Sequence, residues 1–512
     1  MFKNHPKGLL GAALSNMGER FGFYIMMAIL SLFLMSKFGL EKTSAGIIYS
    51  IFYALIYILA LVGGRIADKT KKYKSTIFIG LILMAIGYIL IAIPTPTPVP
   101  NLAIYLGLTC FGLLVIAFGN GLFKGNLQAV VGQMYDKPEY SKKRDVGFQL
   151  FYMFINVGAL FAPLFAVGIR NWWVESKGFL YNADLPGLCH KIIGGNHEVA
   201  PKLSELAEKA GAGVIPVENT DKLIEFANQY LDIFNTGFHY AFGIAIIAML
   251  ISLTIYIVNK NKFPNPAEKK AASSADIKMT AQEIKQRFYA LFAVFAVVIF
   301  FWFSFHQNGL TLTYFAKEYT NLSMLSFKLG PVRFEGAEIF QFFNPFFVVF
   351  LTPVVIAFFG WLRAKDKEPS TPRKIAIGMG IAAIAFIVML LGSTGLPSNK
   401  EIIDMHGGAL PEAMRVTPFL LIGTYFILTI AELFISPLGL AFVSKVAPPQ
   451  HQGIMQGCWL GATALGNQLL FIGAILYESI HPKVAWGVFV AACLISMCTM
   501  LAMVKWLERV TK

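Results

Sequence analysis

Long apolar stretches recur along the whole chain and constrain its fold more than any other feature. Crossing a bilayer as an α-helix takes roughly 20 mostly apolar residues, and about twelve segments meet this requirement. Because 56% of the residues are hydrophobic and only 14% are charged, the composition also differs from that of soluble domains. The chain is therefore predicted to be an all-α, multi-pass membrane protein. The predicted spans are 8–36, 44–64, 75–94, 102–132, 147–170, 235–259, 285–316, 338–362, 373–393, 414–442, 452–478 and 484–507.

The connecting segments alternate in basic content. Lys and Arg are abundant in RIADKTKKYK, DKPEYSKKR, NKNKFPNPAEKK and RAKDKEPSTPRK, whereas IPTPTPVPN is uncharged and 171–235 has mixed charge. Cytoplasmic loops carry the excess of basic residues, so the first set and both termini are predicted to be cytoplasmic. The net charge of +14 then follows mostly from loop topology, and no nucleic-acid partner is expected.

A polar segment, 260–284, divides the chain into two halves. Residues 1–259 are predicted to form an N-terminal six-helix bundle with an outer insertion, 171–235, and residues 285–512 a C-terminal six-helix bundle. A faint repeat links the halves, because GGRIADKTKK closes the second span and FFGWLRAKDK closes the eighth. Parallel six-helix repeats with a site between them are the architecture of major facilitator transporters, which is the predicted fold. The insertion is expected to be a cap with one or two short helices, or else a lid or partner site.

The first predicted span carries Glu19 and Arg20 side by side, although a charge at the bilayer centre costs roughly 2.5–3.5 kcal/mol. At 100° per residue, one helix face of about 140° collects the polar groups of this span. The members of that face are Asn16, Glu19, Arg20, Phe23, Tyr24 and Met27. This face is predicted to line a water-filled cavity between the halves, with a structural Glu–Arg pair as the alternative.

Further polar residues fall inside other predicted spans. They are Lys124, Asn156, His306, Asn344 and Glu432. Cations in the first half and an acid in the second suit a zwitterionic ligand. Lys124 is also expected to neutralise Glu432 when the cavity is empty. No nucleophile–base pair and no metal-spaced cluster is evident, so neither an enzyme, a cofactor nor a metal site is predicted.

Several motifs resemble one known family. The run GERFGFYIMM is similar to the E-x-x-E-R-F-x-Y-Y-G-M-R pattern of the proton-coupled oligopeptide transporters, and FYMFINVGAL is similar to their F-Y-x-x-I-N-x-G signature. Their seventh, eighth and tenth helices are matched by FWFSFHQNG, NPFFVVFLTP and AELFISPLGL. The resemblance implies a bacterial-type member of the cytoplasmic (inner) membrane, importing di- and tripeptides with protons by alternating access. A monomer is expected.

The resemblance also implies roles for individual residues. Arg20 and Lys124 would hold the peptide carboxylate, and Glu432, with Asn156 and Asn344, would hold the amino terminus. Aromatic pocket walls accept varied side chains. The implied pocket residues are Phe23, Tyr24, Tyr57, Trp302, Phe305 and Trp459, with packing as the alternative for the two tryptophans.

The chain departs from the family pattern at four positions. Asn16 replaces the first Glu, Phe23 a Tyr, Met27 an Arg, and His306 an acid. Since the Arg and the acid of an outer-gate pair are both missing at Met27 and His306, that gate is expected to close by apolar packing. Proton coupling is assigned to Glu19 and Glu432 with His306 modulating it, or else His306 is a neutral gate residue.

Two other functions stay open at this point. A proton-independent peptide facilitator is one, because Asn16 cannot carry a proton. A transporter of another anion or amphipathic metabolite, such as nitrate, is the other.

Overall fold

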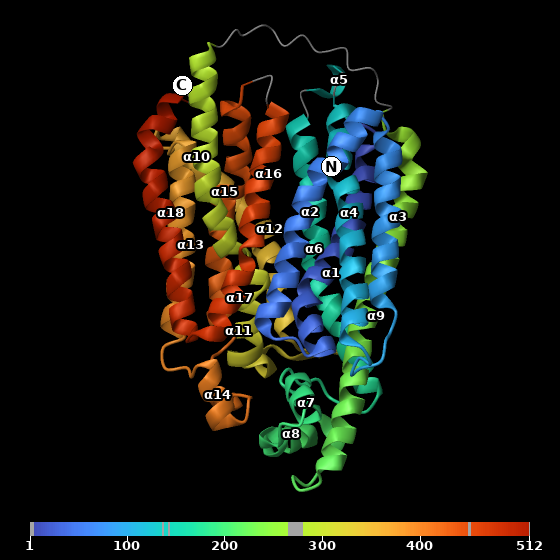
Figure 1. The fold of residues 1–512 in the computed structure, drawn as a ribbon. Coiled ribbons are helices and arrows are strands. Elements are labelled where there is room, and N and C mark those ends of the chain that lie inside the picture. Colours follow the sequence, from blue (N-terminus) through green and yellow to red (C-terminus); the bar gives the residue numbers. More distant parts are fainter. Residues whose placement is uncertain (1–4, 136–137, 142–143, 265–279, 449–451, 511–512) are drawn as a thin grey trace.

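Long helices make up almost the whole molecule. The computed structural model describes residues 5–135, 138–141, 144–264, 280–448 and 452–510. Among these residues, 12 helices are long and apolar enough to cross a membrane, as the sequence predicts. Both termini lie at one end of the molecule, and the short helices between the fifth and sixth spans lie at the other (Figure 1). We call these the termini end and the insertion end.

Six long helices form the first half. They are α1 (Leu9–Phe38), α2 (Lys42–Thr70), α3 (Tyr73–Ala92), α4 (Leu102–Met134), α6 (Arg144–Ser176) and α9 (Thr220–Asn259). Small residues allow close helix packing in membranes. A Cβ atom on Gly63 of α2 would lie 2.1 Å from the carbonyl oxygen of Gly121 on α4, and one on Gly80 of α3 would lie 2.7 Å from that of Gly119. Glycine is therefore required where these helices touch.

Several spans of the second half are interrupted. Its helices are α10 (Ala281–Phe305), α11 (Thr311–Tyr319), α12 (Phe343–Ala364), α13 (Thr371–Gly392), α15 (Phe419–Val446), α16 (Gln452–Gln468), α17 (Leu470–Ser479) and α18 (Pro482–Val510). Short 3-10 segments at His306–Gly309 and Ala337–Phe342 continue the seventh and eighth spans, and the eleventh breaks between α16 and α17. The predicted segments 285–316 and 452–478 are thus each two helices. In the former, polar residues and a glycine at 306–309 separate α10 from α11.

The insertion comprises residues 177–219, between α6 and α9. It contains α7 (Leu185–Ile193), a 3-10 turn (His197–Val199), α8 (Ala200–Ala207) and a π segment (Glu208–Ala212). Its predicted end at 235 is wrong, because an amphipathic helix starts at Thr220 and continues unbroken into the sixth span as α9. The Asn219 side chain caps this start by accepting from the backbone N–H of Lys222 (3.1 Å).

Smaller elements complete the chain. They are α5 (Pro138–Ser141), α14 (Asn399–His406), the antiparallel strands β1 (Phe327–Leu329) and β2 (Val332–Phe334), and 3-10 turns at Lys260–Lys262, Leu322–Leu325 and Glu412–Met414. The hairpin and α14 follow the seventh and ninth spans. Most of the predicted linker, 260–284, lies outside the described residues.

Candidate functional site

A cavity of about 240 Å³ is lined by residues of both halves. This volume lies just below the roughly 300–1,000 Å³ typical of drug-sized ligand pockets, which fits a small solute. The structure brings most of the predicted site residues to this cavity. Those on its wall are Arg20, Phe23, Tyr24, Met27, Tyr57, Lys124, Asn156, Trp302, Phe305, His306, Asn344 and Glu432.

Arg20 faces the cavity but is already engaged by its neighbour. Its Nε donates to Glu19 Oε2 (2.5 Å) and its Nη2 to Glu19 Oε1 (2.6 Å), and the guanidinium carbon lies 4.5 Å from the Phe23 ring centre. Glu19 also accepts from Asn120 Nδ2 of α4 (2.7 Å) and is only 1% exposed. The predicted polar face is therefore too wide, because its Asn16 and Glu19 edge is buried away from the cavity wall.

Lys124 presents a free ammonium group. Among the described residues it forms no ion pair, and its Nζ lies 4.4 Å from the Tyr57 ring centre. The expected neutralisation of Glu432 by Lys124 is absent from this structure. An ammonium over an aromatic face is a weaker interaction than a buried ion pair, so Lys124 retains most of its capacity to bind an anion.

Glu432 stands on the wall that the second half contributes. Its Oε2 accepts from Asn344 Nδ2 (2.9 Å), and the same amide donates to Thr429 Oγ1 (3.1 Å). Asn156 of α6 lines the same cavity and donates to the carbonyl oxygen of Tyr152 (3.3 Å). The side-chain carbonyl oxygen of Asn156 and the second oxygen of Glu432 remain available as acceptors.

His306 is fixed among aromatic rings. It stacks on Trp302 (4.9 Å between ring centres, 19°), lies 4.9 Å from the Tyr53 ring, and its Nδ1 is 2.5 Å from Asn467 Oδ1. Because an amide oxygen can only accept, His306 Nδ1 donates. This arrangement orients the histidine ring on the cavity wall.

Trp459 requires a correction. It is absent from the cavity lining, is buried, and packs edge-on against Phe295 (6.2 Å). Its indole lies where a Cβ atom on Gly439 of α15 would stand. Trp459 therefore fills the contact between helices, as the packing alternative predicted.

Sequence reasoning missed several cavity residues. They are Tyr49, Tyr53, Ile56, Gln128, Tyr152, Ile155, Ala159, Pro163, Asn308, Gly309, Gln341, Pro345, Tyr425 and Ser436. A usable signal existed for two of them, because Tyr49, Tyr53 and Tyr57 recur at four-residue spacing and so share one helix face. Gln341 carried no such signal, since it reaches the cavity from a 3-10 turn.

Ion pairs join the two halves at the insertion end. Lys42 of α2 pairs with Glu318 of α11 (2.7 Å), and buried Arg170 of α6 pairs with buried Glu338. Asp184 of the insertion pairs with Arg415. The expected apolar packing of an outer gate considered only the positions of Met27 and His306, and it stays a prediction. The charged contacts at the insertion end come instead from α2, α6, α11, the insertion and the segments before α12 and α15.

Among the residues that the structure describes, no group of three or more His, Cys, Asp or Glu side chains is arranged to hold a metal ion.

A family model and several known relatives match most of this chain. A family model described as PTR2, POT family, matches residues 74–288 and 266–486. A peptide transporter of Yersinia enterocolitica is 29% identical over 493 residues, covering 91% of this chain and 87% of that protein. The dipeptide and tripeptide permease B of Xenorhabdus bovienii is 26% identical over 541 residues, covering 99% of this chain and 97% of the relative.

A solved structure supports the fold independently. The crystal structure of a peptide transporter, POT, in complex with sulfate superimposes with a TM-score of 0.72 at 24% identity, covering 100% of this chain and 96% of that one. This likeness confirms the predicted all-α architecture of twelve spans.

Proposed function

The chain belongs to the POT family, and we propose that it imports di- and tripeptides across the bacterial cytoplasmic membrane by alternating access, coupled to protons. One observation carries this proposal: a cavity between the halves has a free cation, Lys124, on one wall and a carboxylate, Glu432, on the other. A peptide is a zwitterion with charges at its two ends, so it fits between these walls. A simple anion such as nitrate would leave Glu432 without a cationic partner.

The peptide carboxylate binds to the first half. Lys124 is the main anchor, since its ammonium has no carboxylate partner among the described residues. Arg20 is a secondary anchor because Glu19 already occupies two of its donors. Charge-assisted hydrogen bonds of this kind are about twice as strong as neutral ones.

The peptide amino terminus binds to the second half. Asn344 holds the Glu432 carboxylate in place through one oxygen, which leaves the other for the ligand ammonium. Asn156 offers its amide oxygen from α6. Tyr24, Tyr57, Trp302 and Phe305 supply aromatic walls with few fixed polar groups, so that side chains of different shape are accepted.

The insertion end faces the outside of the cell. This orientation follows from the basic loops at the opposite end, and it makes the ion pairs Lys42–Glu318, Arg170–Glu338 and Asp184–Arg415 an outer closure. Outward opening requires these pairs to separate. Peptide binding and outer closure therefore use the same interface between the halves.

Proton binding is assigned to Glu19 and Glu432. Protonating Glu19 would remove its charge from Arg20 and free the guanidinium for the peptide, and protonating Glu432 would release its hold on the ammonium. His306 modulates the coupling from the cavity wall. The driving force is about 2.3 kcal/mol per charge per 100 mV, which corresponds to roughly fifty-fold accumulation.

Uptake of labelled dialanine into proteoliposomes tests the proposal. With an inward proton gradient and a negative interior we expect accumulation that an uncoupler abolishes. N-acetyl-dialanine and dialanine amide should compete poorly, because each lacks one charge, and nitrate should not compete. Equal competition by both modified forms would contradict the two-ended binding mode. Equilibration without accumulation would identify a facilitator.

A further inference from the structure

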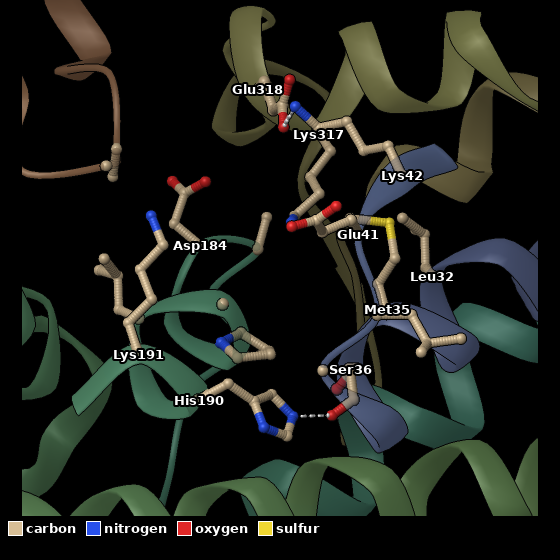
Figure 2. Close-up of a pocket in the computed structure, with 18 of the residues that line it drawn as sticks. Leu32, Met35, Ser36, Glu41, Lys42, Asp184, His190, Lys191, Lys317 and Glu318 are labelled. Carbon is tan, nitrogen blue, oxygen red and sulfur yellow. Dashed lines mark hydrogen bonds and ion pairs between the residues drawn. The ribbon is translucent and has the colours of Figure 1, made fainter. Parts of the chain in front are cut away.

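A second cavity, of about 480 Å³, lies at the insertion end. It is lined by the end of α1, the start of α2, α7 of the insertion and α11. Figure 2 shows Asp184, His190 and Lys191 on one side, and Glu41, Lys42, Lys317 and Glu318 on the other. The His190 ring lies 2.6 Å from the Ser36 carbonyl oxygen and so fixes α7 against α1. None of these residues belongs to the central cavity.

The wall of this cavity carries four cationic side chains, Lys42, Arg170, Lys191 and Lys317, and four acidic ones, but only some of them form ion pairs. Three of its four acids are engaged: Glu318 by Lys42 (2.7 Å), Glu478 by the backbone N–H of Thr43 (2.9 Å), and Asp184 by Arg415. Among the described residues, Lys191 and Lys317 have no carboxylate partner. These two lysines come from different halves and line the same cavity.

We propose that this outer cavity binds a small carboxylate-bearing solute through Lys191 and Lys317. Leu32, Met35 and Ile403 supply apolar surface beside these ammonium groups, as a small organic acid with a carbon skeleton requires. Glu41 is exposed at the cavity, so the site also accepts a solute that carries an ammonium group beside its carboxylate. Binding at this site does not rest on the proposed function.

The lowered pKa of Lys191 supports a carboxylate-binding site in this cavity. Burial, and then the positive charges of Lys42 and Lys317, lower the pKa of Lys191, while the carboxylate of Glu318 raises it by less than either lysine lowers it. Lys191 and Lys317 therefore repel each other across the cavity, and a bound carboxylate relieves that repulsion. A lysine with a lowered pKa is also partly unprotonated at mildly alkaline pH, so it reacts with acylating reagents. A ligand bound at its ammonium group slows that reaction, and the rate therefore reports ligand binding.

Amine acylation of the purified full-length protein tests the site. Brief treatment with an acetylating reagent, followed by mass spectrometry, gives the modification rate at each lysine. We expect N-acetyl-dialanine, which has a carboxylate and no ammonium, to slow acylation of Lys191 and Lys317 several-fold. N-acetyl-dialanine amide, which has neither a carboxylate nor a reactive amine, should leave both rates unchanged. Lys222 is exposed at the start of α9, outside the cavity lining, and should react equally in all samples.

The same measurement in the Lys124→Ala variant separates this site from the central one. Protection that persists there supports an independent outer site, whether or not the protein transports peptide. Protection that disappears would mean that the signal comes from the central cavity, and it would overturn the proposal. Absence of protection in the unmodified protein, or equal protection by sulfate at matched ionic strength, would also overturn it.

Substitution of one lysine provides a quantitative check. Lys191→Gln should raise the concentration of N-acetyl-dialanine that half-protects Lys317 by about tenfold, the effect of one charge-assisted hydrogen bond. Lys222→Gln should leave that concentration unchanged. An unchanged value for Lys191→Gln would contradict a site shared by the two lysines.

Discussion

Opposite charges from the two halves meet at two levels of this protein, with different outcomes. At the insertion end, Lys42–Glu318, Arg170–Glu338 and Asp184–Arg415 are direct ion pairs across the interface. In the central cavity, Lys124 and Glu432 stand on opposite walls without such a pair. One level is closed by its own charges, and the other holds its charges apart.

Under the proposed function, this difference explains how one interface can both close and bind. Where the side chains reach each other, the charges are satisfied within the protein and no solute is needed. Where a cavity separates them, a zwitterion of suitable length satisfies both at once. The outer cavity combines the two arrangements, since Lys42 is paired while Lys191 and Lys317 form no ion pair with any residue that the structure describes.

Removal of the free cation in the central cavity should have the largest effect. Lys124→Ala deletes the proposed main carboxylate anchor, so dialanine uptake into proteoliposomes should fall by on the order of a hundredfold. Expression and thermal stability should stay near normal, because Lys124 forms no ion pair within the described part of the chain. Lys222→Ala serves as the matched control with unchanged uptake. Wild-type rates for Lys124→Ala would place the binding charge elsewhere.

The buried pair at the insertion end should govern stability. Arg170 is 1% exposed and Glu338 0% exposed, so Arg170→Met strands an unpaired carboxylate and should lower the free energy of unfolding by about 3–5 kcal/mol. The double variant Arg170→Met/Glu338→Met should recover most of this loss. Thermal unfolding of the purified proteins measures both. A single variant as stable as the unmodified protein would show that Glu338 finds another partner.

The half-buried pair Lys42–Glu318 should affect closure without affecting folding. Lys42→Met removes a pair worth about 1 kcal/mol, which should raise the population open at the insertion end roughly fivefold. Maleimide labelling of Met27→Cys, in a variant lacking the native cysteines, measures this population from the insertion side. Lys209→Met is the control, because Lys209 pairs with Glu205 inside the insertion (2.8 Å). Equal labelling of the Lys42→Met and Lys209→Met variants would show that Lys42 does not contribute to closure.

An ion pair within one half should have the smallest effect. At the termini end, Arg363 and Lys374 hydrogen-bond to Glu368 and lower the pKa of its carboxyl to about 2. This stabilisation is present above the ordinary pKa of glutamate and is lost as the pH falls toward 2. Glu368→Gln should therefore lower the melting temperature slightly at pH 7 and by less at pH 3. Met27→Cys labelling should not change, since this pair does not cross between the halves.

The spans and the main cavity residues were predictable because they depend on local patterns. Apolar length identifies a span wherever it lies, and helical periodicity placed Arg20, Phe23, Tyr24 and Met27 together. The same periodicity could not exclude Glu19, because the position of Asn120 on another helix decides where that carboxylate is buried. The sequence of one helix shows which of its residues share a face, but it does not show which residues of other helices contact that face.

The closing contacts were not predictable for a related reason. Asp184 and Arg415 are separated by more than two hundred positions, and neither belongs to a motif. Their meeting depends on how the insertion folds and on where the segment before α15 passes. Likewise, the break between α16 and α17 directly follows Gly466, Asn467 and Gln468, and these three residues by themselves do not distinguish an interrupted span from a continuous one.

The unbroken helix α9 joins the insertion to the membrane-spanning part of the first half. Its 40 residues extend about 60 Å, roughly twice the thickness of the hydrocarbon core. The segment that leaves the bilayer is therefore continuous with the segment that packs inside the first half. If the two halves rock against each other, a label near Thr220 would move further than a label on the first half inside the membrane. The distance from this label to one on α14, in the second half, would therefore report the rocking angle.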